Sequence, residues 1–300
     1  MATTKPVSPK TEKRSRPAES VTGRSGTATA TKRDRRSQTR RIPIEHLGSP
    51  STAVVITGGG EGIGEASALR LAEAGRPVAI WDKDAERADE VALACRDRFG
   101  TQAIGVAIDV THTRELDDAV LFTRNNLGVI GGLVHAAGVI RANAIDQLSD
   151  EIWDETMAVN LRAAAMLTKA LTPALVEATP GSAIVYVSSM DAFVSNKLVS
   201  AYDASKAGLL GLTRSAAHAL GPSGIRVNAV CPGYVRTQMT DLLFATEAVI
   251  DHIATKIPLL RVAEADDIAT VIRFLLSDEA AYVTGSSITV DGGVTSTRTS

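Results

Sequence analysis

The sequence has few of the residues on which disulfide-rich, metal-binding and membrane-spanning proteins depend. Of its 300 residues, two are cysteines and five are histidines. Cys95 and Cys231 lie far apart, and the histidines show no ligand spacing, so the sequence predicts neither a disulfide framework nor a metal site. No apolar run has the length of a membrane span or the form of a secretory signal. We therefore expect a protein of a reducing, cytoplasmic compartment without membrane contact.

Aromatic residues are also scarce, at 4% of the chain, whereas hydrophobic residues make up 44%. A core built from Ala, Val, Ile and Leu is typical of soluble α/β proteins. The chain is long enough for one large or two small domains. Only a short polar tail, residues 294–300, follows the last predicted strand, so we expect a single folded domain over residues 46–293.

Charge is distributed unevenly, although the net charge is only −2. Residues 1–41 hold 12 Lys and Arg against 3 Asp and Glu, which leaves the rest of the chain acidic. This basic segment is rich in Ser, Thr, Pro and Gly, and it cannot bury enough apolar surface to offset the entropy of ordering. We expect residues 1–45 to form a disordered arm. A solvated extension is the preferred interpretation, and an organelle transit segment or contact with nucleic acid are the alternatives.

A strand-like apolar run over residues 53–56 breaks into a series of glycines and then into a helical pattern. In a dinucleotide-binding turn, Gly58 allows the tight turn, Gly62 admits the cofactor pyrophosphate to the backbone, and Gly64 lets the helix pack on the strand. Methyltransferases and plain tight turns also use such a glycine series, so the turn alone does not decide the function. The candidate cofactor-binding residues of this stretch are Thr57, Gly58, Gly62, Ile63 and Gly64.

Two acidic residues follow the next predicted strands. Asp82 ends the strand 77–81, about 20 residues beyond the glycine turn, where a carboxylate that binds the adenosine ribose is expected. The alternative is that Asp82 caps the helix predicted to start at Ala85. Asp109, followed by Val110, ends a third strand, and it either contacts the adenine edge or caps the helix that follows.

The fourth predicted strand, residues 131–135, leads into Ala137 and Gly138, small residues that let a cofactor lie against the backbone. Residues 149–176 then predict one long helix, bent near Pro173. Asn160 lies among apolar residues in this helix, and a buried amide needs hydrogen-bond partners. On the pattern alone, a structural hydrogen bond to the backbone is the preferred interpretation of Asn160.

Residues with the potential for acid/base chemistry come after the fifth predicted strand, residues 183–187. Ser189 lies at its carboxyl end, where ligands bind in open α/β sheets. The next predicted helix, 201–220, begins with Tyr202 and Lys206, which are four residues apart and therefore share one face, about 6 Å apart along the axis. The alternative is an exposed pair, but a Tyr and a Lys at the start of a helix rich in Ala, Gly and Leu favour chemistry.

With these residues, the chain resembles the short-chain dehydrogenase/reductase family, in its one-domain soluble form, over about residues 50–293. The motifs that carry the resemblance are Thr57-Gly58-x-x-x-Gly62-x-Gly64, Asp82, Asp109-Val110, Ala136-Ala137-Gly138, Asn160, Ser189, Tyr202-x-x-x-Lys206, Asn228 and Pro232-Gly233. The predicted fold is a doubly wound parallel sheet of Rossmann type with helices on both faces.

The resemblance implies hydride transfer between a nicotinamide cofactor and an alcohol or carbonyl carbon. Tyr202 is expected to be the general acid/base, with the Lys206 ammonium favouring its phenolate and binding the nicotinamide ribose. Ser189 would orient the substrate oxygen, and Asn160 would hold a water that links Lys206 to solvent. The loop after the sixth strand resembles the segment that cradles the nicotinamide, and its candidate residues are Pro232, Gly233, Val235 and Thr237.

The charges near the glycine turn favour NAD(H) over NADP(H). Asp82 would accept hydrogen bonds from both ribose hydroxyls and repel a 2′-phosphate, and Glu61 adds a second negative charge. Lys83 argues the other way, but as the residue directly after Asp82 it should point elsewhere. The alternatives to an NAD-dependent alcohol dehydrogenase are an NADPH-dependent 3-oxoacyl-thioester ketoreductase and a protein that senses NAD without turnover.

The resemblance also implies a homodimer or homotetramer, with the helices 149–176 and 201–220 in the main contact. The chain departs from the family pattern at His135, which replaces an amide that ties the central strand to its neighbours, and at Asp191 and Phe193 near the substrate. The segment 238–260 is expected to form an apolar lid, which suggests an apolar substrate unless its side chains pack inward.

Overall fold

The fold is known from a computed structural model that describes residues 50–241 and 243–296. The predicted basic arm, residue 242 and residues 297–300 lie outside the described residues. All described residues belong to one folded unit.

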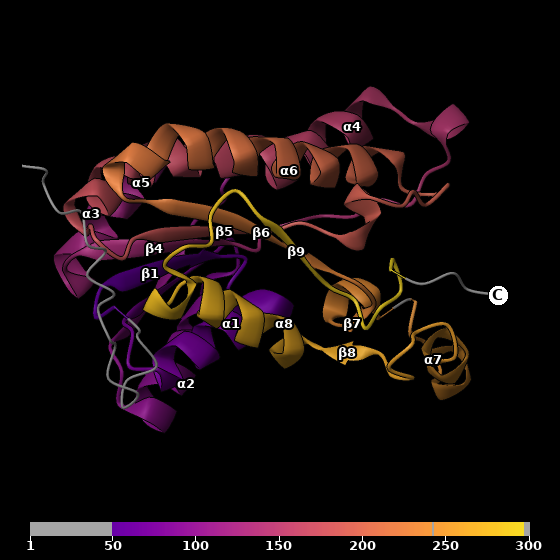
Figure 1. The fold of residues 1–300 in the computed structure, drawn as a ribbon, viewed down its shortest axis with the longest axis horizontal. Helices are drawn as coiled ribbons and strands as arrows, with labels where there is room; N and C mark the ends of the chain where they lie inside the picture. The colour runs from indigo at the N-terminus through magenta and orange to yellow at the C-terminus, as the bar shows by residue number, and fades with distance from the viewer. Residues whose placement is uncertain (1–49, 242, 297–300) are drawn as a thin grey trace, which may run out of the picture. The chain divides into compact units, whose positions relative to one another are not determined.

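A seven-stranded sheet forms the centre of this unit (Figure 1). Every neighbouring pair of its strands is parallel. The order reverses between β1 and β4, and such a switch point opens a crevice at the carboxyl ends of the strands. The predicted doubly wound α/β fold is therefore confirmed. In spatial order the strands are β3 (Ala103–Ala107), β2 (Val78–Asp82), β1 (Ala53–Thr57), β4 (Ile130–His135), β5 (Ala183–Val187), β6 (Arg226–Pro232) and β9 (Ser287–Val290).

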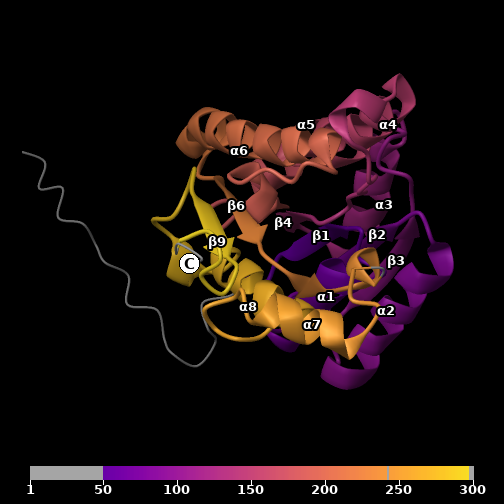
Figure 2. The same cartoon turned by 90° about the vertical axis from the view of Figure 1, so that its right-hand side faces the viewer.

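Helices cover both faces of the sheet (Figures 1 and 2). One face carries α3 (Leu116–Leu127), α5 (Ala163–Glu177) and α6 (Ser200–Leu220), and the other carries α1 (Gly62–Glu73), α2 (Ala85–Phe99) and α8 (Ala265–Leu275). α4 (Asp150–Met157) leads into α5. Short 3-10 turns occur at Ile145–Gln147, Met190–Ala192, Gly221–Ser223, Gln238–Thr240 and Asp278–Ala280.

The two-layer cover follows from the alternation of side chains along each strand. In β1, Val55 packs into the core under α3, α5 and α6, whereas Val54 and Ile56 pack into the core under α1, α2 and α8. Leu133 and Val134 divide in the same way in β4. Because both faces of the central strands are buried, these strands read as continuous apolar runs, which is why the sequence predicted them well.

Two local features differ from the prediction. The long helix 149–176 contains a π-helical segment, Ala158–Arg162, centred on Asn160, between α4 and α5. The segment predicted as a lid contains α7 (Glu247–Ala254) and is preceded and followed by the strands of a small parallel sheet, β7 (Val235–Arg236) and β8 (Ala263–Glu264). Two-residue strands have no readable alternation, so the sequence did not predict this sheet.

None of the described helices has both the length and the apolarity needed to cross a membrane. The compartment of the protein stays a prediction.

Candidate active site

A cleft of about 920 Å³ runs across the carboxyl ends of the central strands. All the predicted site residues line it except Thr57 and Asn160, which are completely buried beside it. Segments that are far apart in the sequence therefore meet in one cavity. These segments are the glycine turn, the ends of β2 to β5, the start of α6 and the loop after β6.

The glycine turn has the geometry of a diphosphate site. Gly58 has a φ of +62°, and a methyl group added there would come within 2.7 Å of the Ala137 backbone. A methyl group at Gly64 would collide with the Gly58 carbonyl oxygen. Glu61, the N-cap residue of α1, makes no side-chain hydrogen bond to the helix. The first-turn N–H groups thus have no side-chain cap, and a phosphate would be a suitable acceptor for them.

Asp82 connects the end of β2 to the glycine turn. Its carboxylate accepts the N–H groups of Gly60 and Asp84, both at 3.0 Å. The N-cap of α2 is Asp84, whose side chain accepts the Arg87 N–H at 3.2 Å. The alternative in which Asp82 caps this helix is therefore wrong. Its contact with a ribose stays a prediction.

Asp109 also lies in the cleft wall. Its Oδ1 accepts the backbone N–H and the hydroxyl of Thr111, at 2.9 and 2.7 Å. The N-cap of α3 is Glu115, so the alternative in which Asp109 caps that helix is wrong. Asp109 instead stabilises the turn that leaves β3, and Val110 follows it into the cleft.

Ser189, Tyr202 and Lys206 meet where β5 ends against α6, and each is at least nine-tenths buried. The Lys206 ammonium donates to the Val187 carbonyl oxygen at 2.8 Å and lies 5.4 Å from the centre of the Tyr202 ring. The Ser189 side chain interacts with the Tyr202 hydroxyl. The helical spacing predicted from the sequence thus brings an acid, a cation and a hydroxyl together.

Burial governs the protonation of this group. It raises the pKa of Tyr202 well above its usual range, and the nearby charges of Asp191 and Asp203 act in the same direction. Burial also lowers the pKa of Lys206 to about 8. That Lys206 favours the phenolate stays a prediction, and the net pKa of Tyr202 is raised because desolvation disfavours its charged form. Tyr202 is a neutral phenol near pH 7, which suits a proton donor.

Asn160 is completely buried in the π-helical segment. Its Nδ2 donates to the Val139 carbonyl oxygen and to Ser205 Oγ, both at 3.0 Å, and its Oδ1 accepts the Val139 N–H at 2.8 Å. Ser205 Oγ in turn donates to the Tyr202 carbonyl oxygen at 2.7 Å. Asn160 therefore ties the loop after β4 to the start of α6, the structural role that the pattern alone favoured. Its part in a proton relay stays a prediction.

His135 still ties the central strand β4 to its neighbour β1, although it replaces the amide that the family pattern has at this position. Its Nδ1 lies 2.9 Å from the Thr57 hydroxyl, which joins β4 to β1 directly below the glycine turn. Burial, with the charge of Lys206, lowers the pKa of His135 to about 3. The imidazole is therefore neutral and serves as a hydrogen-bonding group in the core.

The loop after β6 closes the other side of the cleft. Pro232, Gly233, Val235 and Thr237 all line it. A methyl group at Gly62 would come within 3.3 Å of the Thr237 side chain, so the loop and the glycine turn approach each other closely. Thr237 is thus placed to contact a ligand that enters along the turn.

Arg87 is a cleft residue that the sequence analysis missed. Its Nη1 lies 3.2 Å from both Glu61 Oε2 and Gln238 Oε1, so it bridges the glycine turn and the loop after β6. The Glu61 charge that was set against a 2′-phosphate is therefore paired with a cation. One exposed Arg on an amphipathic helix carries no sequence signal that separates it from its neighbours.

The apolar lid residues pack inward in part. Ile250 and Ile253 of α7 form a small core with Ile257 and Val262. Met239 lines the cleft and is partly exposed. The inference of an apolar substrate from the lid composition thus loses much of its support.

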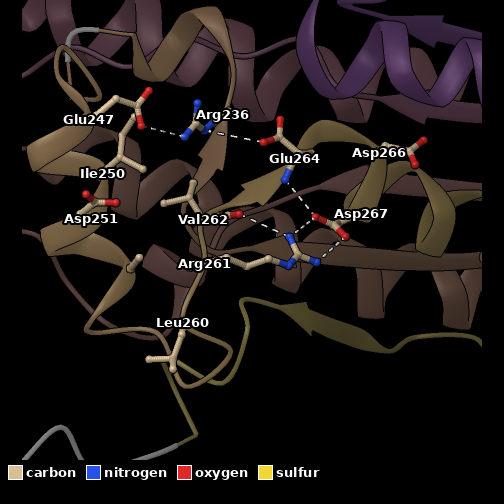
Figure 3. Close-up of a pocket in the computed structure, with 11 residues that line it drawn as sticks. Arg236, Glu247, Ile250, Asp251, Leu260, Arg261, Val262, Glu264, Asp266 and Asp267 are labelled. Carbon is tan, nitrogen blue, oxygen red and sulfur yellow. Dashed lines mark hydrogen bonds and ion pairs between the residues drawn. The ribbon is translucent and has the colours of Figure 1, made fainter.

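A second hollow, of about 590 Å³, lies between α7, β7 and the start of α8 (Figure 3). Arg236 spans it, with ion pairs to Glu247 at 3.7 Å and to Glu264 at 3.6 Å, and Arg261 pairs with Asp267. The Arg236–Glu247 pair connects α7 to β7, the strand that precedes Thr237, and the Arg236–Glu264 pair connects β7 to β8. Across residues 50–241 and 243–296, no group of three or more His, Cys, Asp or Glu is arranged to hold a metal ion.

Comparison with known proteins finds relatives that align with most of this chain and with nearly all of their own length. A family model described as enoyl-(acyl carrier protein) reductase matches residues 58–295. The 3-oxoacyl-[acyl-carrier-protein] reductase FabG of Staphylococcus aureus is 34% identical over 243 residues, which are 81% of this chain and 97% of that protein. The (3R)-3-hydroxyacyl-CoA dehydrogenase of Mus musculus is 35% identical over 254 residues, 81% of this chain and 96% of that protein. The solved structure of L-sorbose reductase from Gluconobacter frateurii, in complex with NADPH and L-sorbose, superposes with a TM-score of 0.79 at 28% identity, covering 84% of this chain and all of that one.

Proposed function

The chain belongs to the short-chain dehydrogenase/reductase family and is an NAD(P)-dependent oxidoreductase that acts on the CH–OH group, and we propose that it interconverts a secondary alcohol and a ketone with NAD(H) as its preferred cofactor. The observation that carries the proposal is the meeting of Ser189, Tyr202 and Lys206 in the cleft that begins at the glycine turn. A cytoplasmic location is part of the same proposal.

The residues present fit a nicotinamide dinucleotide. The uncapped first turn of α1 would hold the pyrophosphate, Asp82 would hold the adenosine ribose, and the loop from Pro232 to Thr237 would hold the nicotinamide. When bound, the cofactor supplies or accepts the hydride. The chain's own residues then have to orient the substrate oxygen and move one proton to or from it.

In reduction, the carbonyl carbon gains a hydride and the carbonyl oxygen gains a proton. We assign that proton to the Tyr202 hydroxyl, which is neutral near pH 7 and buried at the end of the cleft. Ser189 would donate a hydrogen bond to the same oxygen. The Lys206 ammonium, 5.4 Å from the ring, would stabilise the phenolate until Tyr202 regains a proton, and oxidation would use the same groups in reverse.

The preference for NAD(H) rests on Asp82. A carboxylate 5 to 7 Å from a 2′-phosphate, at an effective dielectric constant of ~20, opposes its binding by a few kcal/mol before salt screening. Glu61 adds little to this repulsion, because Arg87 pairs with it. We expect at least a tenfold lower dissociation constant for NADH than for NADPH, measured by nucleotide fluorescence. Equal affinities would overturn the preference.

A second candidate function is the reduction of a 3-oxoacyl thioester with NADPH. It is supported by the names of two relatives, a 3-oxoacyl-[acyl-carrier-protein] reductase and a 3-hydroxyacyl-CoA dehydrogenase. Acetoacetyl-CoA separates the candidates. A kcat/KM for acetoacetyl-CoA with NADPH that exceeds every value for simple ketones with NADH would favour the thioester reductase.

The experiment that tests the proposal is a screen of secondary alcohols with NAD⁺ and of ketones with NADH, followed at 340 nm. Turnover by the native chain and its loss in Tyr202→Phe would support hydride transfer with Tyr202 as the acid. Tight NADH binding without turnover on any member of the panel would favour a sensor of NAD instead.

We also propose a homodimer or homotetramer. Several small residues of the two helices expected at the contact are buried within the chain itself, including Ala163, Ala164, Ala216 and Ala217, so they serve its own core. Ala207 and Gly211 lie on the more exposed side of α6, where a second copy would pack. A monomeric mass by light scattering at micromolar concentration would overturn this.

A further inference from the structure

Two carboxylates lie beside the proposed proton donor without a part in the function described so far. Asp191 belongs to the 3-10 turn Met190–Ala192, directly after Ser189, and its backbone N–H donates to Ser189 Oγ at 3.1 Å. Asp203 follows Tyr202 on α6. Its Oδ2 accepts the Asn196 N–H at 3.0 Å, and its Oδ1 is buried with no hydrogen-bond partner among the described residues. The turn packs against α6, which brings the two negative charges within reach of each other.

The Ser189 hydroxyl connects these carboxylates to the proposed proton transfer. Its side chain interacts with both the Asp191 carboxylate and the Tyr202 hydroxyl. A serine has only one proton to donate, and an ionised carboxylate is a stronger acceptor than a neutral oxygen. While Asp191 is ionised, the Ser189 proton is therefore held toward Asp191. A neutral carboxyl group releases that proton, and its own O–H can donate to Ser189 Oγ.

We propose that Asp191 is a positioning residue that sets the direction of the Ser189 hydroxyl, turning its proton away from the substrate oxygen when ionised and freeing it for the substrate when neutral. The proposal rests on the proposed function, in which Ser189 donates to the substrate oxygen. Asp191 does not exchange a proton with the substrate. Its carboxylate takes up one proton from solvent and releases it to solvent again. Reduction, which uses two donors on the carbonyl oxygen, is therefore faster when Asp191 is protonated.

The pH range of this effect follows from the groups around Asp191. Burial and repulsion by Asp203 raise the pKa of Asp191 to about 6, and burial also raises the pKa of Asp203. The other titratable groups near it on the packed elements are Tyr202 and Lys206 on α6 and Cys231 on β6. Burial raises the pKa of Tyr202 far above neutrality, raises that of Cys231 to about 11 and lowers that of Lys206 to about 8.

Nearby groups outside these elements do not interfere with this range. His135, at the end of β4, has its pKa lowered to about 3, and Lys197, in the loop between the Met190–Ala192 turn and α6, is exposed. Between pH 5 and 7, Asp191 is thus the group of this cluster that changes charge, and the charge of Asp203 influences its titration.

The expected size of the effect follows from the fraction of neutral Asp191. With a pKa near 6, about one tenth of Asp191 is protonated at pH 7 and about nine tenths at pH 5. The kcat for reduction should therefore rise up to about ninefold over this interval. Asp191→Asn keeps the shape of the side chain, cannot ionise and has an amide that donates to Ser189, so its kcat should be high and nearly constant over the same interval.

The test combines a titration without substrate and a pH profile with substrate. The full chain, labelled with ¹³C at the aspartate carboxyl groups, is titrated by NMR without cofactor, and the signal absent in Asp191→Asn identifies Asp191. Reduction of acetoacetyl-CoA and of cyclohexanone by NADH is then measured from pH 5 to 7.5. The set comprises the native chain, Asp191→Asn, Asp203→Asn and the control Asp97→Asn, which removes an exposed carboxylate of α2.

We expect the Asp191 signal to titrate near pH 6, and at a lower pH in Asp203→Asn because the repulsion is removed. The kinetic midpoint should move in the same direction, and Asp97→Asn should match the native chain. An Asp191 midpoint below pH 5, or the same rise of kcat at low pH in the native chain and in Asp191→Asn, would overturn the inference. Reduction that persists in Tyr202→Phe would instead overturn the proposed function, so the two failures are distinguishable.

Discussion

Replacing Asn160 by Ala removes the side chain that joins the loop after β4 to the start of α6. Three hydrogen bonds are lost, two to the backbone of Val139 and one to Ser205. The site is completely buried and the surrounding segment is π-helical, so the neighbouring groups have little freedom to find other partners. Both stability and the position of Tyr202 should therefore suffer.

The loss can be estimated from the bonds themselves. A net contribution of ~0.5–1.5 kcal/mol for each hydrogen bond gives about 3 kcal/mol for the three, and buried groups left without partners act in the same direction. In a domain of this size, each kcal/mol lowers the Tm by roughly 2–4 °C. We expect Asn160→Ala to unfold about 6–12 °C below the native chain.

Thermal unfolding of the full chain without cofactor measures this directly, and Asn126→Ala is a matched control. Asn126 also lies on a helix, but it is exposed and makes a single bond, to the Phe122 carbonyl oxygen at 2.8 Å. That variant should change the Tm by no more than about 2 °C. If Asn160→Ala unfolds at the same temperature as Asn126→Ala, the structural role assigned to Asn160 is wrong.

Three further outcomes follow from the site. Asp82→Ala should bring the dissociation constants of NADH and NADPH to within about threefold of each other in a fluorescence titration, and an unchanged ratio would show that Asp82 does not select the cofactor. Gly58→Ala forces a methyl group to within 2.7 Å of the Ala137 backbone, so it should weaken NADH binding by at least ~100-fold. The control Gly221→Ala should bind NADH normally, because Gly221 has open space around it and a negative φ. The pKa of His135 is lowered in the folded state to about 3, from an unfolded value of ~6.5. The stability that the neutral imidazole contributes is therefore complete above pH ~6.5 and is lost as the pH falls below that value. The Tm should decrease between pH 7 and 5, and it should decrease less in His135→Asn.

The sheet and its helices were predictable because the central strands, such as β1, β4 and β5, are buried on both faces and are followed by polar or small residues. Predicted and observed ends agree within one or two residues for most elements, and the fifth strand, Ala183–Val187, agrees at both ends. The gathering of the site residues followed from the same pattern, since parallel strands present their carboxyl ends at one edge of the sheet.

Other features could not be read from the sequence, because they depend on contacts between distant segments. The π-helical segment at Asn160 is fixed by hydrogen bonds to Val139 and Ser205, and neither partner is marked by a local pattern. Arg87 meets Glu61 and Gln238 only after three separate segments have folded together. The small sheet of β7 and β8 is too short to show an alternation.

The protonation states of Tyr202 and Lys206 could not be predicted from the sequence either. Spacing on the helix placed Lys206 near Tyr202, and the attraction between opposite charges then suggested a lowered pKa for the phenol. The structure adds the burial of both groups and the charges of Asp191 and Asp203, which together act more strongly in the opposite direction. Distances along a helix predict which groups meet, but the degree of burial decides their charge.

The most direct test of the account is the transfer of deuterium from NADH that carries deuterium at both positions of nicotinamide C4 to a ketone that the native chain reduces. For the native chain, mass spectrometry should find one deuterium in the alcohol product for each cofactor oxidised. Tyr202→Phe should bind the labelled NADH with a dissociation constant within about threefold of the native value and yield less than a few per cent of the deuterated alcohol. Deuterium transfer at the native rate in Tyr202→Phe would contradict the assignment of Tyr202 as the proton donor, on which the proposed chemistry depends.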